Sequence, residues 1–365
     1  MRISIATDAW FPQVNGVVRS LSTTVSILLE RGFEVDLITP DQFLTVPMPG
    51  YREIRLAVAP RFGARRALKA FRPDVVHIVT EGPIGWSARA WCMAHGVPFT
   101  TAFHTRFPDY AAVRTGLSVD RFWPIMRRFH QPSHAVMVST PRLADELRER
   151  RIKATRLWTR GIDRQIFCPV GAVHPALVLL PKPILLSVGR VSIEKNLDAF
   201  LKAAMPGTKI VVGDGPALAQ MRARYPEVLF LGALHGDALA SAYRAADVFV
   251  FPSLTDTFGL VMIEALACGV PVAGFPVQGP LDVIGRTGRG PDAMLKEPVG
   301  ALDEDLGRAI DRAQRLSRVA AARYGASFDW DMSTDQFVDV LEDAIRAQPA
   351  SPHAPRQMAS ALPAA

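Results

Sequence analysis

The chain has 365 residues, which is more than one hydrophobic core usually organises, so we expect two domains. Hydrophobic residues make up 49% and charged residues 21%, a balance that excludes wholesale disorder. Lys and Arg total 42 against 35 Asp and Glu, a net charge of +7 at pH 7. This excess favours anionic partners such as nucleotides, acidic lipids or nucleic acid, without choosing among them.

Cysteine usage and hydropathy indicate the compartment. Cys92, Cys168 and Cys268 lie far apart with no CxxC pair, so neither a zinc site nor a disulfide framework is indicated. The N-terminus meets Asp8 too early for a signal peptide, and no run of about 18 uncharged apolar residues occurs. We therefore expect a cytoplasmic protein, either soluble or peripheral at the inner face of the cytoplasmic membrane.

Short β-branched runs alternate with helical stretches along the whole chain. In the first half the predicted strands are Arg2–Ala6, Glu34–Thr39, Val75–Val79, Phe99–Phe103 and Ala135–Ser139. A helix is predicted over Val17–Arg31, ending at the C-cap signal Gly32. In the second half we predict the strands Ile184–Val188, Lys209–Val212, Val228–Leu231, Val248–Phe251 and Pro271–Gly274, with helices that include Asn196–Ala204 and Phe258–Cys268. This alternation predicts an α/β protein with two doubly wound, Rossmann-like domains.

A proline-rich stretch separates the two series of strands. We predict a first domain over 1–167, a linker over 168–183 and a second domain over 184–325. A final helix within 326–347 is expected to pack back toward the first domain, and a disordered tail is expected over 348–365. Two such domains place a ligand in the cleft at the carboxyl ends of their strands.

The second half contains three candidate ligand-binding motifs. Arg190 and Lys195 follow the strand that ends near Gly189, and together they suit a diphosphate, although two solvated surface cations are the plainer interpretation. The turn Gly213-Asp214-Gly215 follows the next strand. Glycines there allow a close backbone approach to a ligand, or simply a tight strand–helix junction.

The third motif combines two carboxylates with a helix N-terminus. Asp256 lies in a loop and Glu264 lies about two turns into the following helix. Backbone amides around Phe258 and Leu260 would offer an anion site, and the carboxylates could accept hydrogen bonds from sugar and ribose hydroxyls. An N-cap Asp and a surface Glu are the alternative, but Glu264 stands in an apolar run where an unpaired carboxylate would be costly to bury. We therefore expect a ligand or a partner for it.

These motifs, in this order, resemble the donor half of glycosyltransferase family 4, whose members are retaining, nucleotide-sugar-dependent enzymes of the GT-B fold. The segment Thr7–Val17 resembles the opening loop of that family, which lines the cleft and meets the donor phosphates. His77–Pro83 and Phe103–Pro108 resemble a subgroup that contains the GDP-mannose-dependent α-mannosyltransferases and the sulfoquinovosyldiacylglycerol synthases. The resemblance covers about residues 1–345. Asp256 stands where the family usually has Glu, a shortening that this subgroup often shares.

The resemblance implies a role for each matching residue. Gly16, Arg190 and Lys195 would hold the diphosphate, with Gly213 in the same donor site. Glu264 would bind the ribose. The sugar and the β-phosphate would be held by Asp256, Phe258, Gly259 and Leu260. His104, which follows a strand, would face the cleft near the sugar, although a lone His in that place is usually a structural residue. The predicted catalytic set is thus His104, Arg190, Lys195 and Asp256.

The implied reaction needs no metal and no cofactor beyond the nucleotide sugar, because the basic residues can stabilise the leaving diphosphate. No covalent nucleophile is well placed, so front-face attack by the acceptor hydroxyl is favoured. Asp329-Trp330-Asp331 is a literal D-x-D, but its position before the last predicted helix favours an N-cap.

Basic amphipathic segments indicate the acceptor side. The candidate acceptor or membrane residues are Arg65, Arg66, Lys69, Arg106, Arg127 and Arg128. Cations among aromatic residues at helical spacing suit an anionic membrane surface, and two solvated helix faces are the alternative. No nucleic-acid recognition module accompanies them.

We therefore expect a hexosyltransferase that moves mannose from GDP-mannose to a lipid or glycolipid hydroxyl. A UDP-sugar-dependent glycolipid synthase of the sulfoquinovosyl- or glucosyl-diacylglycerol type is the alternative. An NAD-dependent dehydrogenase using Gly213-Asp214-Gly215 is a weaker one, since Leu218 replaces the third glycine of the dinucleotide fingerprint.

Overall fold

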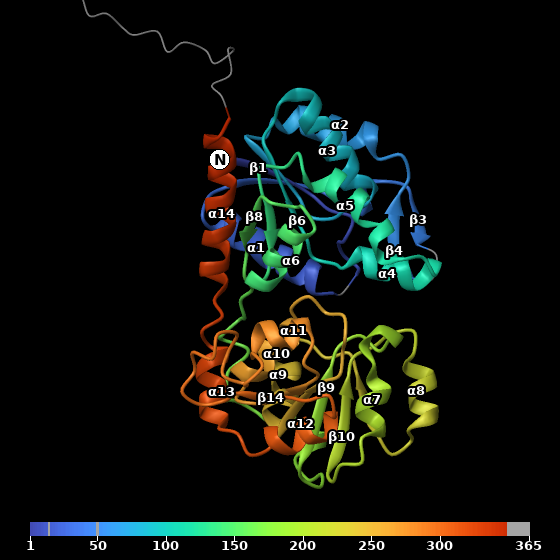
Figure 1. Ribbon diagram of the computed structural model, residues 1–365, viewed down its shortest axis with the longest axis vertical. Helices are drawn as coiled ribbons and strands as arrows, with labels where there is room; N and C mark the ends of the chain where they lie inside the picture. Colours follow the sequence, from blue (N-terminus) through green and yellow to red (C-terminus); the bar gives the residue numbers. More distant parts are fainter. Residues whose placement is uncertain (14, 49–50, 349–365) are drawn as a thin grey trace, which may run out of the picture.

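The computed structural model describes residues 1–13, 15–48 and 51–348 and shows two α/β domains, one above the other in Figure 1. Val14 of the opening loop and the predicted tail beyond Gln348 lie outside the described residues.

The first domain is built on a parallel six-stranded sheet in the order β2-β1-β5-β6-β7-β8. Its strands are β1 (Arg2–Ala6), β2 (Glu34–Ile38), β5 (Val75–Ile78), β6 (Phe99–Ala102), β7 (Val136–Val138) and β8 (Thr155–Leu157). Its helices are α1 (Gly16–Glu30), α2 (Arg61–Phe71), α3 (Pro83–His95), α4 (Phe107–Thr115), α5 (Trp123–His130) and α6 (Pro141–Glu149). An antiparallel hairpin of β3 (Thr45–Met48) and β4 (Tyr51–Ala57) is added beside it.

The second domain repeats the architecture with the order β11-β10-β9-β12-β13-β14. Its strands are β9 (Ile184–Val188), β10 (Thr208–Val212), β11 (Leu229–Gly232), β12 (Val248–Phe251), β13 (Val272–Gly274) and β14 (Gly300–Leu302). Its helices are α7 (Leu197–Lys202), α8 (Leu218–Arg224), α9 (Gly236–Ala245), α10 (Leu260–Ala267), α11 (Gln278–Val283), α12 (Leu306–Ala313) and α13 (Arg318–Gly325). The predicted pair of doubly wound sheets is confirmed.

The strand order locates the cleft. In the first sheet the winding reverses between β1 and β5, and in the second between β9 and β12. Loops that leave the carboxyl ends of neighbouring strands diverge at such a point and leave room for a ligand. The loops after β6 and β9 and the loop after β12 carry the predicted catalytic residues, so the topology gathers these residues at the edges of the two sheets.

The chain crosses between the domains twice, and the two crossings lie side by side. Trp158 is buried in the first core, whereas Ile162 is buried in the second. The returning segment pairs with this crossing through the bridge between Ile162 and Asp329. The fit is tight, because a Cβ on Gly161 would lie 2.3 Å from the backbone nitrogen of Trp330.

The segment predicted as the linker, 168–183, packs along the second domain. Arg244 of α9 donates hydrogen bonds to the carbonyls of Cys168 at 3.2 Å and Ala172 at 2.8 Å. Leu177 is fully buried in the second core. A proline-rich stretch cannot continue a sheet, but it can lie against one domain in this way.

The last helix, α14 (Trp330–Arg346), lies along the first domain (Figure 1). Its Phe337 and Leu341 are buried in the same core as Ile3 and Ile5 of β1. Asp329 caps the helix by accepting a hydrogen bond from Asp331 N at 2.6 Å, which confirms the N-cap interpretation of the D-x-D.

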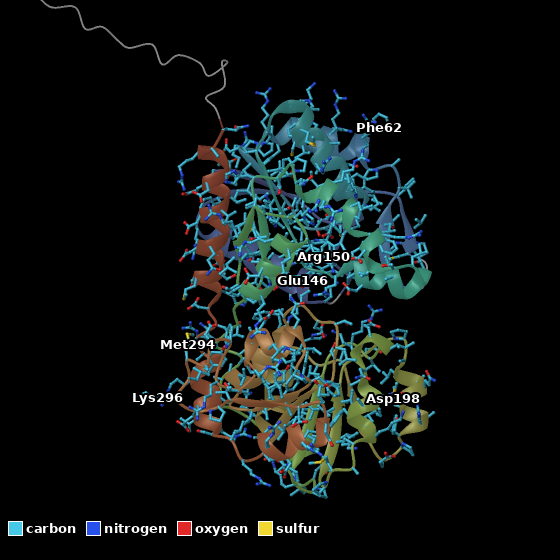
Figure 2. All side chains as sticks on the ribbon, viewed as in Figure 1. Phe62, Glu146, Arg150, Asp198, Met294 and Lys296 are labelled. Atoms are coloured by element: carbon cyan, nitrogen blue, oxygen red, sulfur yellow. The ribbon has the colours of Figure 1, made fainter. Side chains whose placement is uncertain are left out.

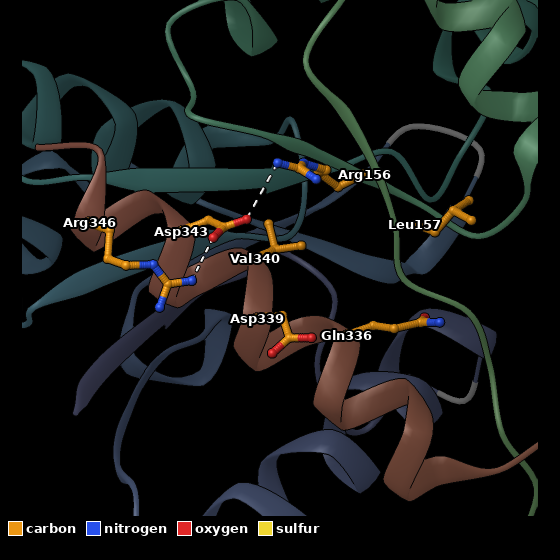
Figure 3. A pocket seen from close by; sticks show the side chains of 7 residues that line it. All are labelled: Arg156, Leu157, Gln336, Asp339, Val340, Asp343 and Arg346. Atoms are coloured by element: carbon orange, nitrogen blue, oxygen red, sulfur yellow. Dashed lines mark hydrogen bonds and ion pairs between the residues drawn. The ribbon is translucent and has the colours of Figure 1, made fainter.

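A shallow pocket lies between the end of β8 and α14 (Figure 3). It is lined by Arg156, Leu157, Gln336, Asp339, Val340, Asp343 and Arg346. Asp343 pairs there with Arg156 at 3.4 Å and with Arg346 at 2.6 Å. None of the predicted donor-site residues lines this pocket.

Candidate active site at the domain boundary

The carboxyl edges of the two sheets face each other, and side chains from both domains meet there. Thr257 Oγ1 donates a hydrogen bond to the carbonyl of His104 at 3.0 Å. Gly16 begins α1 opposite Leu260 of α10, and a Cβ on Gly16 would lie 3.6 Å from Leu260 Cδ1. The predicted opening loop and the predicted donor helix are therefore adjacent.

Lys195 and Asp256 form an ion pair, with Nζ 2.6 Å from Oδ1. The single helical turn Ile193–Lys195 carries the lysine, and Asn196 fastens this turn to the loop after β12 by donating from Nδ2 to the carbonyl of Pro252 at 3.1 Å. The two side chains are 28% and 22% exposed, so a ligand can reach them. Asp256 Oδ2 is buried and has no partner within the described residues.

The glycine turn supports the segment that carries Arg190. A Cβ on Gly213 would lie 1.8 Å from the carbonyl oxygen of Gly189, and Val191 N donates to the carbonyl of Asp214 at 2.9 Å. Glycine is therefore required at 213 so that the two backbones can pack together. Arg190 follows Gly189 directly and is partly buried.

Glu264 is buried, and two side chains satisfy its carboxylate. Arg19 of α1 forms an ion pair with Oε1, and the Tyr243 hydroxyl donates to Oε2 at 3.0 Å. Burial raises the pKa of Glu264, while Arg19 and both hydrogen bonds act in the opposite direction. The sequence predicted a partner for the Glu264 carboxylate but did not identify Arg19 or Tyr243, because these residues lie 245 and 21 positions away in the chain.

Phe258, Gly259 and Leu260 form the turn into α10. Phe258 is buried and packs edge-on against Phe328, with ring centroids 6.1 Å apart. Gly259 has φ +85°, and a Cβ there would lie 2.8 Å from Met262 Cε, so the tight entry to the helix depends on glycine. Backbone amides at the start of a helix have no carbonyl one turn earlier in the same helix, so the start of α10 is a place where an anion could bind.

His104 follows β6 and contacts Arg160, which the sequence did not single out. Arg160 Nη2 lies 3.0 Å from His104 Nδ1, and the ring packs on Trp158 at a centroid distance of 5.4 Å. Burial, followed by Arg160 and His77, lowers the pKa of His104 well below 6.5. His104 is therefore uncharged at neutral pH.

The predicted acceptor-side cations fall into separate places. Arg106 forms two hydrogen bonds with Glu146 of α6 at 2.8 and 2.9 Å, and it also contacts Gln278 of the second domain, so protein groups already engage it. Figure 2 places Glu146 at the boundary between the domains.

The other cations lie on α2 and α5. Arg65, Arg66 and Lys69 are exposed on α2, where Phe62 is 81% exposed. In Figure 2 Phe62 lies at the end of the first domain remote from the second. On α5, Arg128 is exposed and Arg127 is partly buried, with Nη1 3.5 Å from the carbonyl of Arg150.

Within the residues that the structure describes, no group of three His, Cys, Asp or Glu side chains is placed to hold a metal ion. In the same part of the chain, no helix combines the length and apolarity needed to cross a membrane.

Two Rossmann-like domains whose facing sheet edges carry these groups define the GT-B class of glycosyltransferases. Residues 14–166 match the sequence profile of Glycosyltransferase Family 4, and residues 182–313 match that of Glycosyl transferases group 1. The chain belongs to glycosyltransferase family 4. It is a glycosyltransferase, and the dehydrogenase alternative is dropped.

Curated relatives are similar over most of the chain. The GDP-mannose-dependent alpha-mannosyltransferase of Mycobacterium tuberculosis (strain CDC 1551 / Oshkosh) is 30% identical, covering 95% of this chain and 98% of that protein. The sulfoquinovosyl transferase SQD2 of Arabidopsis thaliana is 30% identical, covering 89% of this chain and 70% of that protein. The solved structure of sucrose-phosphate synthase from Thermosynechococcus elongatus superposes with a TM-score of 0.75 at 23% identity, covering 95% of this chain and 99% of that one, which shows the shared fold.

A buried carboxylate at the domain boundary makes stability depend on pH. Asp282 of α11 accepts a hydrogen bond from Thr140, the N-cap of α6 in the other domain, at 2.7 Å. Burial raises the pKa of Asp282 from 3.8 to about 6. The folded state thus holds a proton that the unfolded state releases, and the stability associated with this proton is full below pH 4 and lost as the pH rises to 6.

We predict that Asp282→Asn, which keeps an acceptor for Thr140 without the charge, is increasingly more stable than the wild type as the pH rises from 4 to 6. The difference should reach about 3 kcal/mol at most, from a shift of about two pKa units. Thermal unfolding across this range is the measurement. Asp145→Asn, which changes an exposed carboxylate on α6, is the control. Parallel pH profiles for Asp282→Asn and the wild type would contradict the assignment.

Proposed function

We propose that this glycosyltransferase moves mannose from GDP-mannose to a hydroxyl of a lipid or glycolipid, with retention at the anomeric carbon. The observation that carries the proposal is the Lys195–Asp256 pair at the domain boundary, where a cation for a diphosphate stands beside a carboxylate for a sugar. The similarity to a GDP-mannose-dependent mannosyltransferase over nearly the full length of both chains supports the choice of donor.

In this proposal the second domain binds the donor. Arg190 and Lys195, with Gly16 from the opposite domain, hold the diphosphate, and the Gly213 turn packs against the backbone of Gly189, next to Arg190. Glu264 receives the ribose hydroxyls. An oxygen of Glu264 can accept more than one hydrogen bond, so the ribose can bind while Arg19 and Tyr243 stay in place.

The sugar would lie between Asp256 and His104. The amides of Phe258 and Gly259, with Leu260 behind them, face the β-phosphate. The acceptor oxygen bonds to the anomeric carbon on the face that the diphosphate leaves, and its proton passes to the departing phosphate oxygen. Lys195 and Arg190 stabilise the charge that develops there, and no metal is required for this role.

A UDP-sugar-dependent glycolipid synthase is the second candidate. It rests on the similarity to the sulfoquinovosyl transferase, which has the same percentage identity as the mannosyltransferase relative over a smaller share of its own length. The Lys195–Asp256 pair is assigned to the diphosphate and the sugar and does not identify the nucleotide base. The choice between GDP and UDP must therefore be tested directly.

Thermal unfolding with GDP, UDP, ADP and NAD, each measured with and without EDTA, separates the candidates. We predict stabilisation by GDP alone, because a ligand that binds only the folded protein raises its melting temperature by mass action. Stabilisation by UDP alone would transfer the proposal to the second candidate. Loss of the GDP effect on adding EDTA would contradict the metal-independent mechanism.

We predict that Lys195→Ala lowers the transfer rate at least about 100-fold, since loss of one electrostatic contact with transition-state charge costs roughly 3 kcal/mol. The melting temperature should stay near that of the wild type, because the side chain is partly exposed. Transfer of labelled mannose from GDP-mannose to extracted membrane lipids is the measurement. Lys202→Ala is the control, since Lys202 lies on the next helix with its side chain 57% exposed. Wild-type turnover in Lys195→Ala would overturn the assignment of Lys195 to the leaving diphosphate.

The exposed cations of α2 are proposed to contact an anionic membrane surface, together with Arg127 and Arg128 of α5. Arg65, Arg66 and Lys69 stand beside Phe62 on α2, and an exposed aromatic among cations suits the interface of a bilayer. Arg106 is engaged by Glu146, so in the proposal it orders the acceptor side and does not touch lipid.

We predict that Arg65→Ala, Arg66→Ala and Lys69→Ala together reduce binding to vesicles that contain phosphatidylglycerol, since each cation near such a surface contributes about 1 kcal/mol. Co-sedimentation with vesicles is the measurement. The matched control combines Arg286→Ala, Arg289→Ala and Lys296→Ala, which remove three exposed cations from the second domain. Equal losses in the two triple variants would show that net charge, and not α2, governs binding.

A further inference from the structure

Arg160 is a buried cation whose partners are neutral. It stands in the first crossing between the domains and is 6% exposed. Nη1 donates to the carbonyls of Trp158 at 2.6 Å and Thr159 at 3.0 Å, and the guanidinium lies 4.6 Å from the Trp158 ring centroid. No carboxylate among the described residues pairs with it. Burying an arginine without a paired carboxylate is costly.

The contact between Arg160 and His104 determines where the proton of His104 lies. Arg160 Nη2 is 3.0 Å from His104 Nδ1. A guanidinium has only donors, and burial lowers the pKa of Arg160 no further than to about 10, so it stays charged at neutral pH. The hydrogen bond therefore runs from Arg160 to an unprotonated Nδ1. A neutral imidazole that accepts at Nδ1 carries its proton on Nε2.

The other ring nitrogen has no partner within the described residues. His104 Nε2 is buried and makes no hydrogen bond there, and the same holds for Asp256 Oδ2 on the facing loop. The two loops are joined by the hydrogen bond from Thr257 Oγ1 to the carbonyl of His104. The loops that carry this N–H donor and this acceptor oxygen are thus in contact, and neither of the two groups has a protein partner within the described residues. Sugar hydroxyls, which accept and donate, complement such a pair.

We propose that Arg160 is a positioning residue that holds His104 as the neutral Nε2–H tautomer, so that His104 donates a hydrogen bond to a hydroxyl of the transferred sugar. The identity of the ligand rests on the proposed function, whereas the tautomer does not. His104 then acts as a fixed hydrogen-bond donor and not as a general acid or base.

The surroundings of His104 maintain this state. The charged or titratable groups that act on it are Arg160 from the domain crossing and His77 from β5, while Trp158 covers the ring. His77 is itself buried, and its pKa is lowered to about 3, so it stays neutral. Arg160 therefore has two separable effects on His104: it donates to Nδ1, and its charge opposes protonation.

Two substitutions separate these effects. Arg160→Gln removes the charge but keeps an N–H donor, on a side chain two bonds shorter than that of arginine, whereas Arg160→Met removes both at a length close to that of glutamine. Imidazole nitrogen shifts in the ¹⁵N-labelled full chain report the tautomer of His104, with the His104→Gln spectrum used for assignment among the eight histidines. The melting temperature of each variant is measured first.

We expect the wild type and Arg160→Gln to show the proton on Nε2, and Arg160→Met to show a mixture of both tautomers. The pKa of His104 should rise in both variants because both lose the nearby charge. With GDP-mannose, kcat should fall roughly 10- to 100-fold in Arg160→Met, as expected for a lost hydrogen bond, with partial rescue in Arg160→Gln. The affinity for GDP should stay unchanged, because the hydrogen bonds of Arg160 go to Trp158, Thr159 and His104 and to none of the residues proposed to hold the nucleotide.

The proposal is overturned if His104 of the wild type carries its proton on Nδ1, which the spectrum decides even where Arg160→Met fails to fold. It is also overturned if Arg160→Met keeps the single Nε2–H tautomer, for Arg160 would then only cap the carbonyls of the crossing. Absence of mannose transfer in the wild type would contradict the proposed function, but the spectra would still decide the role of Arg160.

Discussion

The carboxylate of Glu264 lies inside the protein, where an ion without a partner would be costly, and the partner comes from the other domain. Arg19 extends from α1 to meet it, while Tyr243 supplies the second hydrogen bond from within the same domain. Because Arg19 is one turn beyond Gly16, this pairing also places the start of α1 against Leu260. One electrostatic requirement thus aligns the opening loop of the first domain with the donor helix of the second.

The two ion pairs of the site differ in how readily they can change. The Glu264 carboxylate is buried, so separating it from Arg19 would leave a charge without water or a partner. Lys195 and Asp256 are partly exposed, and pairs of this kind contribute little net stability. In the proposed function, an arriving diphosphate can therefore take over Lys195 at small cost, while the Glu264 contact keeps the domains aligned. The site thus combines a buried ion pair that stays in place, Arg19–Glu264, with a cation that can change its partner, Lys195.

Much of the fold follows from local pattern. The strands Arg2–Ala6, Ile184–Val188 and Val248–Phe251 occur at the predicted residues, because buried parallel strands are short apolar runs bounded by turns. The strands that the pattern did not reveal are β8 and β14, of three residues each, and the hairpin β3–β4, whose first strand contains Pro47. Such strands are defined by their neighbours in the sheet and not by their own periodicity.

In the candidate site, too, features set by local sequence could be predicted, and features set by tertiary packing could not. Motifs within one loop, such as Lys195 after Gly189 or Asp256 before α10, could be identified from spacing. The partners of Glu264 and His104 could not, since Arg19, Tyr243 and Arg160 are brought there by the packing of separate elements. Arg160 in particular follows a three-residue strand and has no distinctive spacing to any other motif. A cation such as Arg160, whose contacts depend on the packing of separate elements, leaves no periodic signal in the sequence.

The return of α14 to the first domain has a consequence for biosynthesis. Phe337 and Leu341 complete the core around Ile3 and Ile5, so the first domain is assembled from both ends of the chain and the second is inserted between them. Synthesis proceeds from the N-terminus, and every strand of the second sheet is translated before α14 exists. The later-encoded domain can therefore finish folding first, while the earlier one waits on the ribosome with part of its apolar surface uncovered.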